Sequence, residues 1–189
     1  MGRKGEENRQ RIVDAANTLI YHKGFTATSF ADIAETCGMP KGNFYFYFRT
    51  KEDLLDAVVK DRMKRMAVHL DKIYQDFPDP RLRLHRIVNA PLLDRHEVVQ
   101  FGCPIGTLSA ELGKQSKTGI NAVTSMFTVL LLAIRHCLEG MGLNHDEAER
   151  QARHVLTSLQ GAANLSHAFK DGNWLEAEIQ SLHEWIDAQ

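Results

Sequence analysis

The sequence has only three cysteines, and they lie far apart at positions 37, 103 and 137. They form no CxxC pair and no Cys/His cluster, so the pattern favours reduced thiols over a disulfide framework or a zinc site. No apolar run approaches the roughly 18 residues that a membrane-spanning helix needs. The first ten residues, MGRKGEENRQ, are polar and lack the apolar segment of a secretory signal. These absences predict a cytoplasmic protein without a membrane partner.

Net charge is also small, at −1 over 189 residues, which on its own argues against a nucleic-acid-binding protein. The charges are unevenly distributed, however. Residues 1–51 contain eight Lys/Arg and five Asp/Glu, whereas residues 52–189 contain fifteen and nineteen. A basic head on a mildly acidic body is compatible with phosphate contact by the head alone. An imbalance of this size also arises by chance, so charge alone leaves both explanations open.

Catalytic motifs are missing as well. The nine histidines include no HExxH pair and no Cys/His arrangement of a catalytic or metal site, and the chain has no Gly-rich phosphate loop. His136 and Cys137 are adjacent, and adjacent residues of a helix point to different faces. We therefore expect no enzymatic activity, no cofactor and no metal ion.

Apolar residues at helical spacing dominate the chain, and strand alternation is not evident. They make up 43% of the sequence, which is enough for a sizeable core. The pattern predicts an all-α protein of about nine to ten helices. We expect a three-helix head in residues 1–52 with a helix-turn-helix, and a larger helical bundle in residues 53–189. A long helix that opens at Lys51 joins the two parts.

Helix ends are predicted from caps and breakers. The first helix is expected to end at Gly24, and the second to run from a Ser29 cap to a stop at Gly38. Pro40 fits the first turn of the third helix. Later helices are expected over 82–89, over 118–141, over 146–170 with Asn144 as a cap, and from Trp174 to the end. The segment APLLDRHEVVQFGCPIG, residues 90–106, shows no clear pattern.

Residues 28–55 carry the pattern most specific to a function. A helix-turn-helix needs a small residue where its helices cross, a turn glycine, and an apolar residue that faces the first helix. Ala34, Gly38 and Phe44 supply these at spacings of four and six. An A-x-x-x-G pattern is common by itself, but here the caps and periodicity of three helices agree with it. The head is therefore predicted to bind DNA.

Five consecutive aromatic residues, Phe44 to Phe48, lie in the second helix of this motif. One short helix cannot bury five consecutive rings on a single side. Phe44 and Phe48 are four residues apart and are expected to face the core of the head. Tyr45 and Tyr47 then point elsewhere, with hydroxyls that can donate to phosphate oxygens.

The start of the same helix is where base contacts are expected. Asn43 can pair with adenine, Lys41 can pair with guanine or contact a phosphate, and Gly42 permits close approach. Ser29 and Lys51 lie at helix N-termini, which suit phosphate anchoring. For Ser29 a capping role is equally open, and the two roles are compatible.

The head pattern resembles that of the TetR family of transcriptional regulators. The corresponding residues are Gly24-Phe25, Thr28-Ser29, Ile33-Ala34, Gly38, Tyr45-Phe46-Tyr47-Phe48 and Lys51-Glu52-x-Leu54. The stretch SLQGAANLSHAFKDGN, residues 158–173, also resembles a dimer-forming helix of several members. The resemblance implies a homodimer that binds a palindromic operator on double-stranded DNA. It further implies release by a small-molecule effector, with repression more frequent in the family than activation.

The resemblance also implies an effector pocket in the body. Candidate wall residues are Met63, Met66, Leu70, Tyr74, Phe101, Cys103, Phe127 and Leu131. Each also fits an ordinary core position, so that alternative stands beside the pocket. The mixture of methionine and aromatic side chains favours a largely apolar or aromatic small molecule.

Cys103 is a candidate for a different kind of regulation. Pro104 suits the first position of a helix, which puts Cys103 at the N-cap near the positive end of the helix dipole. That setting stabilises a thiolate. The segment is similar to a short element of some TetR-like regulators, a few of which sense oxidants or electrophiles. The alternatives are therefore a repressor that senses redox state or electrophiles through Cys103, a structural cysteine, or an activator on the same scaffold.

Overall fold

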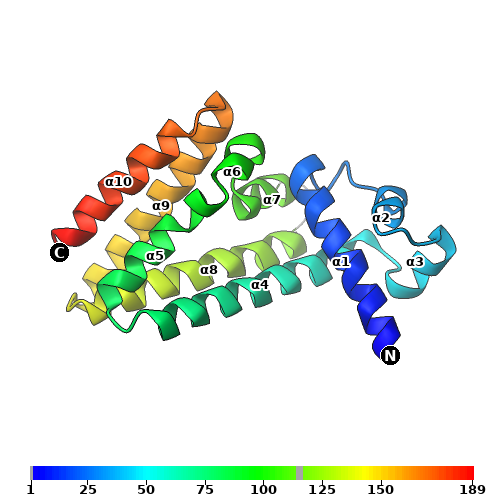
Figure 1. Ribbon diagram of the computed structural model, residues 1–189, viewed down its shortest axis with the longest axis horizontal. Coiled ribbons are helices and arrows are strands. Elements are labelled where there is room, and N and C mark those ends of the chain that lie inside the picture. Colours follow the sequence, from blue (N-terminus) through cyan, green and yellow to red (C-terminus); the bar gives the residue numbers. More distant parts are fainter. Residues whose placement is uncertain (1, 114–116) are drawn as a thin grey trace. The chain divides into compact units, whose positions relative to one another are not determined.

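The computed structural model describes residues 2–113 and 117–189, and of residues 41, 117–120 and 122 it describes the backbone alone. Every regular element in these ranges is a helix, which confirms the predicted all-α fold. The described chain contains ten helices (Figure 1). Their bounds are α1 Arg3–Lys23, α2 Phe30–Thr36, α3 Lys41–Tyr47, α4 Lys51–Asp76, α5 Pro80–Leu93, α6 Arg95–Phe101, α7 Pro104–Leu112, α8 Lys117–Gly140, α9 His145–Phe169 and α10 Asn173–Asp187.

The helices form two compact units. The first unit comprises Met1–Arg65 and Thr107–Thr124, and the second comprises Met66–Gly106 and Ser125–Gln189. The long helices α4 and α8 and the short helix α7 therefore contribute residues to both units. The helix-turn-helix head lies entirely in the first unit.

The helix ends in the head follow the predicted local rules. α1 is followed by Gly24, whose φ of +88° is a conformation that glycine adopts without strain. Ser29 caps α2 in a reciprocal capping box with Asp32. Gly38 has a φ of +63° in the turn that follows α2. These three features confirm the predicted ends of the first two helices.

The third helix begins at Lys41. Pro40 is the N-cap of α3 and does not lie in its first turn, with φ −58° and ψ 134°. Phe44 and Phe48 are 1% and 2% exposed, which confirms that they face the core. Ala34 is also buried, as the helix-turn-helix pattern requires.

The body departs more from the sequence-based expectation. α5 spans Pro80–Leu93 because Asp79 caps it, accepting from the Arg81 N–H at 2.8 Å, and because Pro91 is tolerated near its end. The segment without a clear pattern contains α6 and the start of α7. α9 begins after Asn144, whose side chain accepts from Glu147 N–H at 3.0 Å and confirms the predicted cap.

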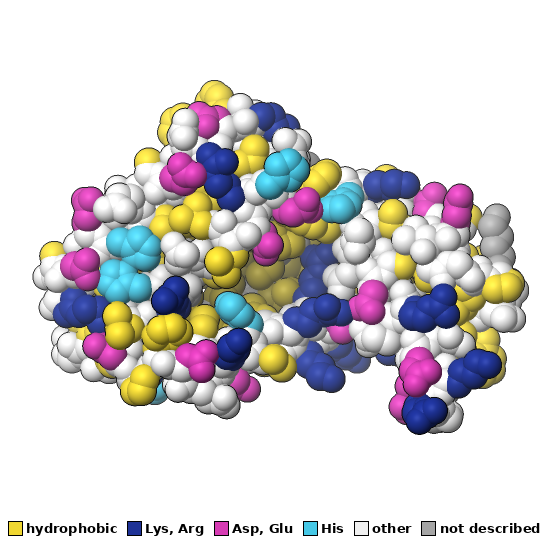
Figure 2. Space-filling model, viewed as in Figure 1, with side chains coloured by type: hydrophobic (Ala, Val, Ile, Leu, Met, Phe, Trp, Pro, Cys, Tyr) yellow, Lys and Arg dark blue, Asp and Glu magenta, His cyan; other side chains and the backbone are white. Residues whose placement is uncertain are grey.

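The core of the second unit contains buried residues of α4, α5, α6, α8, α9 and α10. α9 and α10 lie side by side (Figure 1). Their contact is formed by branched apolar residues, of which Val155, Leu175 and Ile186 are fully buried. At their junction the rings of Phe169 and Trp174 stack, with centroids 5.3 Å apart, and remain 63% and 44% exposed. Figure 2 shows hydrophobic side chains at the surface there.

The expectation that no segment approaches the length of a membrane span is wrong for α8. By length and composition, Val123–Gly140 is apolar enough to cross a membrane, and 33% of it is buried. The core helix of a soluble protein meets the same criterion, so one such helix is weak support for membrane insertion. Leu132 is 43% exposed, so α8 leaves apolar surface uncovered in a single chain.

Candidate nucleic-acid interface

The outer face of α3 is formed by polar and aromatic side chains. Gly42 and Asn43 are exposed, and a Cβ on Gly42 would meet no atom within 4 Å. Tyr45 and Phe46 are 58% and 75% exposed. Lys41 is the first residue of α3, but its side chain lies outside what the structure describes. With Phe44 buried beneath it, this helix presents a mixed surface to solvent.

Tyr47 is tied to the first helix. Its hydroxyl accepts a hydrogen bond from Nδ2 of Asn8 at 3.2 Å, and its side chain is half-buried. The hydroxyl proton of Tyr47 therefore remains a donor for an acceptor such as a phosphate oxygen. Arg11, also on α1, donates to the carbonyl of Cys37 at 2.7 Å. These two long-range bonds link α1 to both helices of the motif.

Ser29 acts as a cap in this structure. Its hydroxyl lies 2.6 Å from Oδ2 of Asp32, and the Asp32 N–H donates back to Ser29 Oγ at 3.2 Å. The side-chain hydrogen bond from Ser29 lowers the pKa of Asp32, with the backbone bond from the same residue adding to the effect. The resulting carboxylate disfavours a phosphate close to it, so the capping role of Ser29 has direct support.

Lys51 points to the turn between α1 and α2. Its Nζ donates to the carbonyl of Thr26 at 2.9 Å and lies 4.6 Å from the ring centroid of Phe25. Phosphate anchoring was predicted for Lys51 because it lies at a helix N-terminus. The sequence pattern did not indicate that the Thr26 carbonyl is its partner within the chain. The ammonium group has three protons, so one backbone acceptor does not use all of them.

Two residues of this surface were not predicted from the sequence. Phe46 is the most exposed large hydrophobic residue in the described chain, and it lies four residues after Gly42 on the same face of α3. The helical spacing that predicts burial of Phe44 and Phe48 also predicts that Phe46 is exposed. Asn8 was missed because its contact with Tyr47 joins residues 39 positions apart, which no local pattern reveals.

Most of the predicted effector-pocket residues lie in the second unit. Leu70 belongs to its hydrophobic core, and Met66, Cys103 and Leu131 pack against that core. Met63 belongs instead to the first unit. Phe101 and Phe127 are half-buried.

Tyr74 is held by polar contacts in the second unit. Its hydroxyl donates to the carbonyl of Ala133 at 3.4 Å and lies 4.0 Å from Sγ of Cys137. Burial, followed by the neighbouring Cys137, raises the pKa of Tyr74 to about 12, although Arg83 over its ring opposes this. Tyr74 therefore offers a neutral phenol at physiological pH.

The predicted helix start at Cys103 is confirmed. α7 begins at Pro104, and the N–H of Gly106 donates to Sγ of Cys103 at 3.4 Å. Cys103 is half-buried, whereas Cys37 and Cys137 are buried. Cys103 is thus the most accessible of the three thiols.

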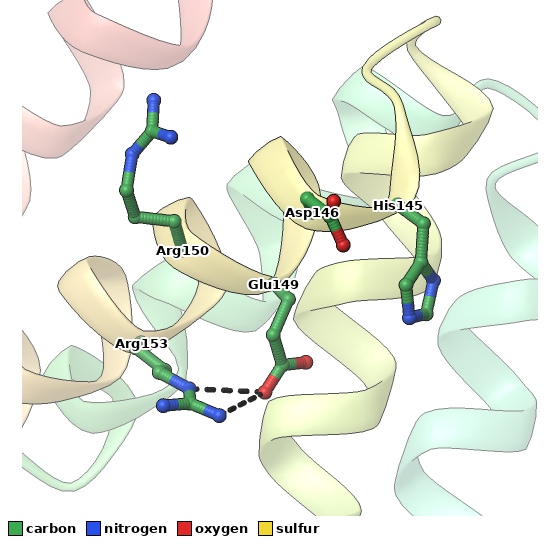
Figure 3. Close-up of a pocket in the computed structure, with 5 residues that line it drawn as sticks. All are labelled: His145, Asp146, Glu149, Arg150 and Arg153. Carbon is green, nitrogen blue, oxygen red and sulfur yellow. Dashed lines mark hydrogen bonds and ion pairs between the residues drawn. The ribbon is translucent and has the colours of Figure 1, made fainter.

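A charged surface hollow of about 290 Å³ lies at the start of α9. Figure 3 shows Arg153 directed at Glu149, which it contacts at 2.9 Å. Glu149 also pairs with Arg135 at 3.2 Å, and the two arginines hold its pKa below the ordinary value, Arg153 contributing most. A hollow lined by charged side chains does not suit an apolar effector.

A three-helix head that exposes such a helix, carried by a larger helical bundle, defines the class of helix-turn-helix DNA-binding regulators. Residues 12–58 match the family described as bacterial regulatory proteins, tetR family. Residues 92–180 match the transcriptional regulator LmrA/YxaF-like C-terminal domain. The chain belongs to the TetR family of transcriptional regulators, whose members bind DNA and usually form dimers that respond to small-molecule effectors.

Similarity to individual proteins extends over nearly the whole chain. An uncharacterised HTH-type transcriptional regulator in the lacX 3′ region of Lactococcus lactis subsp. lactis is 28% identical over 177 residues, 92% of this chain and 90% of the relative. TtgR of Pseudomonas putida, an HTH-type transcriptional regulator, is 25% identical over 97% of this chain and 90% of its own. A TetR transcriptional regulator from Legionella pneumophila has the same fold, with a TM-score of 0.84 and 21% identity over 100% of this chain and 97% of that chain.

Proposed function

We propose that this protein is a ligand-responsive repressor that binds a palindromic operator as a homodimer in the cytoplasm and is released by a small-molecule effector. Residues 1–52 form its DNA-binding domain, and residues 53–189 form its effector-binding and dimerisation domain. The observation that carries the proposal is α3, where Asn43, Tyr45 and Phe46 are exposed above the buried Phe44. Membership of the TetR family supports the same function.

The dimer is proposed to form by pairing α8 and α9 of two chains as a four-helix bundle. The outward face of α9 carries small and weakly polar residues at helical spacing: Thr157, Gly161, Asn164 and Ala168 are all exposed or half-buried. A Cβ on Gly161 would meet no atom within 4 Å, so the chain itself leaves that position open. Ala162 and Ala163 are 6% and 3% exposed and pack within the chain. Gly161 is therefore the position at which a helix of the second chain can approach closely.

Signalling is proposed to pass through α4, whose 26 residues span about 39 Å at about 1.5 Å per residue. Its first half is fastened to α1 by Asp61, which accepts from Gln10 at 2.9 Å and from Asn17 at 3.1 Å. A change in the tilt of α4 would therefore carry α1 with it. An effector that prefers one tilt changes the spacing of the two heads, and by linkage DNA weakens effector binding by the same factor.

Asn43→Ala provides the test of sequence-selective binding. If Asn43 pairs with a base, the variant loses preference at one position of each half-site, at a cost of about 1–3 kcal/mol. Tyr47→Phe is the matched control, because the loss of a phosphate contact weakens binding to all DNA sequences alike. Titration of both variants against selected and random duplexes measures this. Equal loss on both kinds of DNA for Asn43→Ala would assign Asn43 to the backbone and remove its role in base recognition.

A second candidate function is release through modification of Cys103. The observation that favours it is the half-buried Sγ at the start of α7, which accepts from the Gly106 N–H at 3.4 Å. The buried positions of Cys37 and Cys137 make Cys103 the preferred target of a thiol reagent. In this variant of the proposal the effector is an oxidant or an electrophile.

Cys103→Ser separates the two candidates. If Cys103 is the sensor, N-ethylmaleimide releases wild-type protein from DNA, and the serine variant stays bound at the same reagent concentration. Fluorescence anisotropy of a labelled duplex follows the release, with mass spectrometry to locate the adduct. Equal release of the two proteins would make Cys103 structural and leave a reversible ligand as the effector.

A further inference from the structure

The turn between α1 and α2 is held by side chains from two distant helices. The backbone N–H groups of Phe25 and Thr26 donate to the carboxylate of Glu111, at 2.8 Å to Oε2 and 2.6 Å to Oε1. The carbonyl of Thr26 accepts from Nζ of Lys51 at 2.9 Å. Glu111 lies on α7 and Lys51 opens α4, and all four residues belong to the first compact unit. One turn is thus fixed through both its donors and its acceptor.

The Glu111 carboxylate and the two N–H groups that donate to it form a clamp on the turn, and this clamp depends on an ionised Glu111. Partial burial raises the pKa of Glu111, but hydrogen bonds from Thr26 and Phe25 and the charge of Lys51 outweigh that effect and hold the pKa below its usual value. Hydrogen bonds to an ionised acceptor are about twice as strong as those between neutral groups. A Cβ on Gly24 would lie 3.2 Å from Oε2 of Glu111, so the glycine both adopts a positive φ and admits the carboxylate.

The clamped turn leads directly into the DNA-facing helices. Phe25 is 7% exposed in the head core, and Oγ1 of Thr28 donates to the carbonyl of Gly24 at 2.7 Å. The next residue, Ser29, is the N-cap of α2. A displaced turn would therefore move the start of α2, and with it α3, which packs against α2 through the Phe30 and Phe44 rings at 4.5 Å.

We propose that Glu111 is a positioning residue for DNA binding, through which α7 holds the α1–α2 turn in the conformation that presents α3 to the major groove. This inference rests on the proposed DNA-binding function. α7 has nine residues and begins at Pro104, directly after Cys103.

Glu111→Gln tests the proposal by the sign of its effect. Removing a negative charge from a DNA-binding unit would by itself strengthen DNA binding. Glutamine can accept at only one atom, so a lost clamp instead weakens affinity, by about tenfold for one charge-assisted hydrogen bond. The probe is the duplex that the wild-type protein selects from a random-sequence library. Amide hydrogen exchange at Phe25 and Thr26 should accelerate by a similar factor in the absence of DNA.

Two further variants complete the experiment. Glu184→Gln makes the same charge change on α10 and should leave both measurements unchanged. Glu111→Asp keeps the charge on a shorter side chain and should fall between wild type and Glu111→Gln, so it preserves the test if the glutamine variant does not fold. The inference is overturned if Glu111→Gln binds the duplex as tightly as wild type, or more tightly, with unchanged exchange. Failure of the proposed function differs, because the wild type itself would then select no sequence.

Discussion

Gly161→Arg is expected to convert the dimer into a monomer. The position is open in the single chain, and arginine is a better helix former than glycine, so the fold of the protomer should not suffer. In the proposed four-helix bundle the guanidinium would be buried without a partner, which costs several kcal/mol. Dimerisation should weaken by at least about 100-fold. DNA affinity should fall with it, because one head alone reads only half of a palindrome.

Sedimentation velocity at micromolar concentration measures this outcome. Ala177→Arg is the matched control, since Ala177 is an exposed small residue on α10, outside the proposed bundle. The control should sediment as the wild type does. A Gly161→Arg protein that remains a dimer would place the interface elsewhere. A wild-type protein that is already a monomer would contradict the proposed assembly itself.

Phe44→Ala and Phe46→Ala are expected to have contrasting effects, although the chemical change is identical. Phe44 is 1% exposed and packs between Phe30 and Phe48, with ring centroids at 4.5 Å and 6.2 Å. Its removal should lower the free energy of unfolding by about 3–5 kcal/mol. Phe46 is 75% exposed, so its removal should change stability by no more than about 0.5 kcal/mol.

DNA binding distinguishes the two variants further. Phe46→Ala should remain folded but bind the selected duplex several-fold more weakly, because an exposed ring on α3 can contact a thymine methyl group. Denaturant unfolding followed by circular dichroism measures stability, and anisotropy measures affinity. If Phe46→Ala bound DNA with wild-type affinity, this face of α3 would not enter the groove at that residue.

The parts of the fold that depend on local chemistry were predictable. Ser29, Gly24 and Asn144 mark helix ends through hydrogen bonds or backbone angles that involve only neighbouring residues. The burial of Phe44 and Phe48 follows from helical spacing alone. Family resemblance then supplied the class of function, because the head pattern combines several such local features.

The remainder depended on contacts between residues distant in sequence. The Glu111 bonds to the α1–α2 turn join residues about 85 positions apart, and no spacing rule indicates them. Lys51 was assigned to phosphate because its helix end is visible in the sequence and its partner, Thr26, is not. Pro91 concealed the true end of α5, since proline usually stops a helix and here lies inside one. The effector pocket remains a proposal for the same reason: its walls come from separate helices.

Sequencing the DNA that the purified wild-type protein selects from a random library tests the central claim most directly. A dimer with two α3 helices related by a two-fold axis should enrich a palindrome whose half-sites lie about one helical turn, roughly 34–36 Å, apart. Enrichment should be lost with Gly161→Arg and retained with Ala177→Arg. A library that shows no enriched sequence, or a site without two-fold symmetry, would contradict a dimeric, sequence-selective regulator.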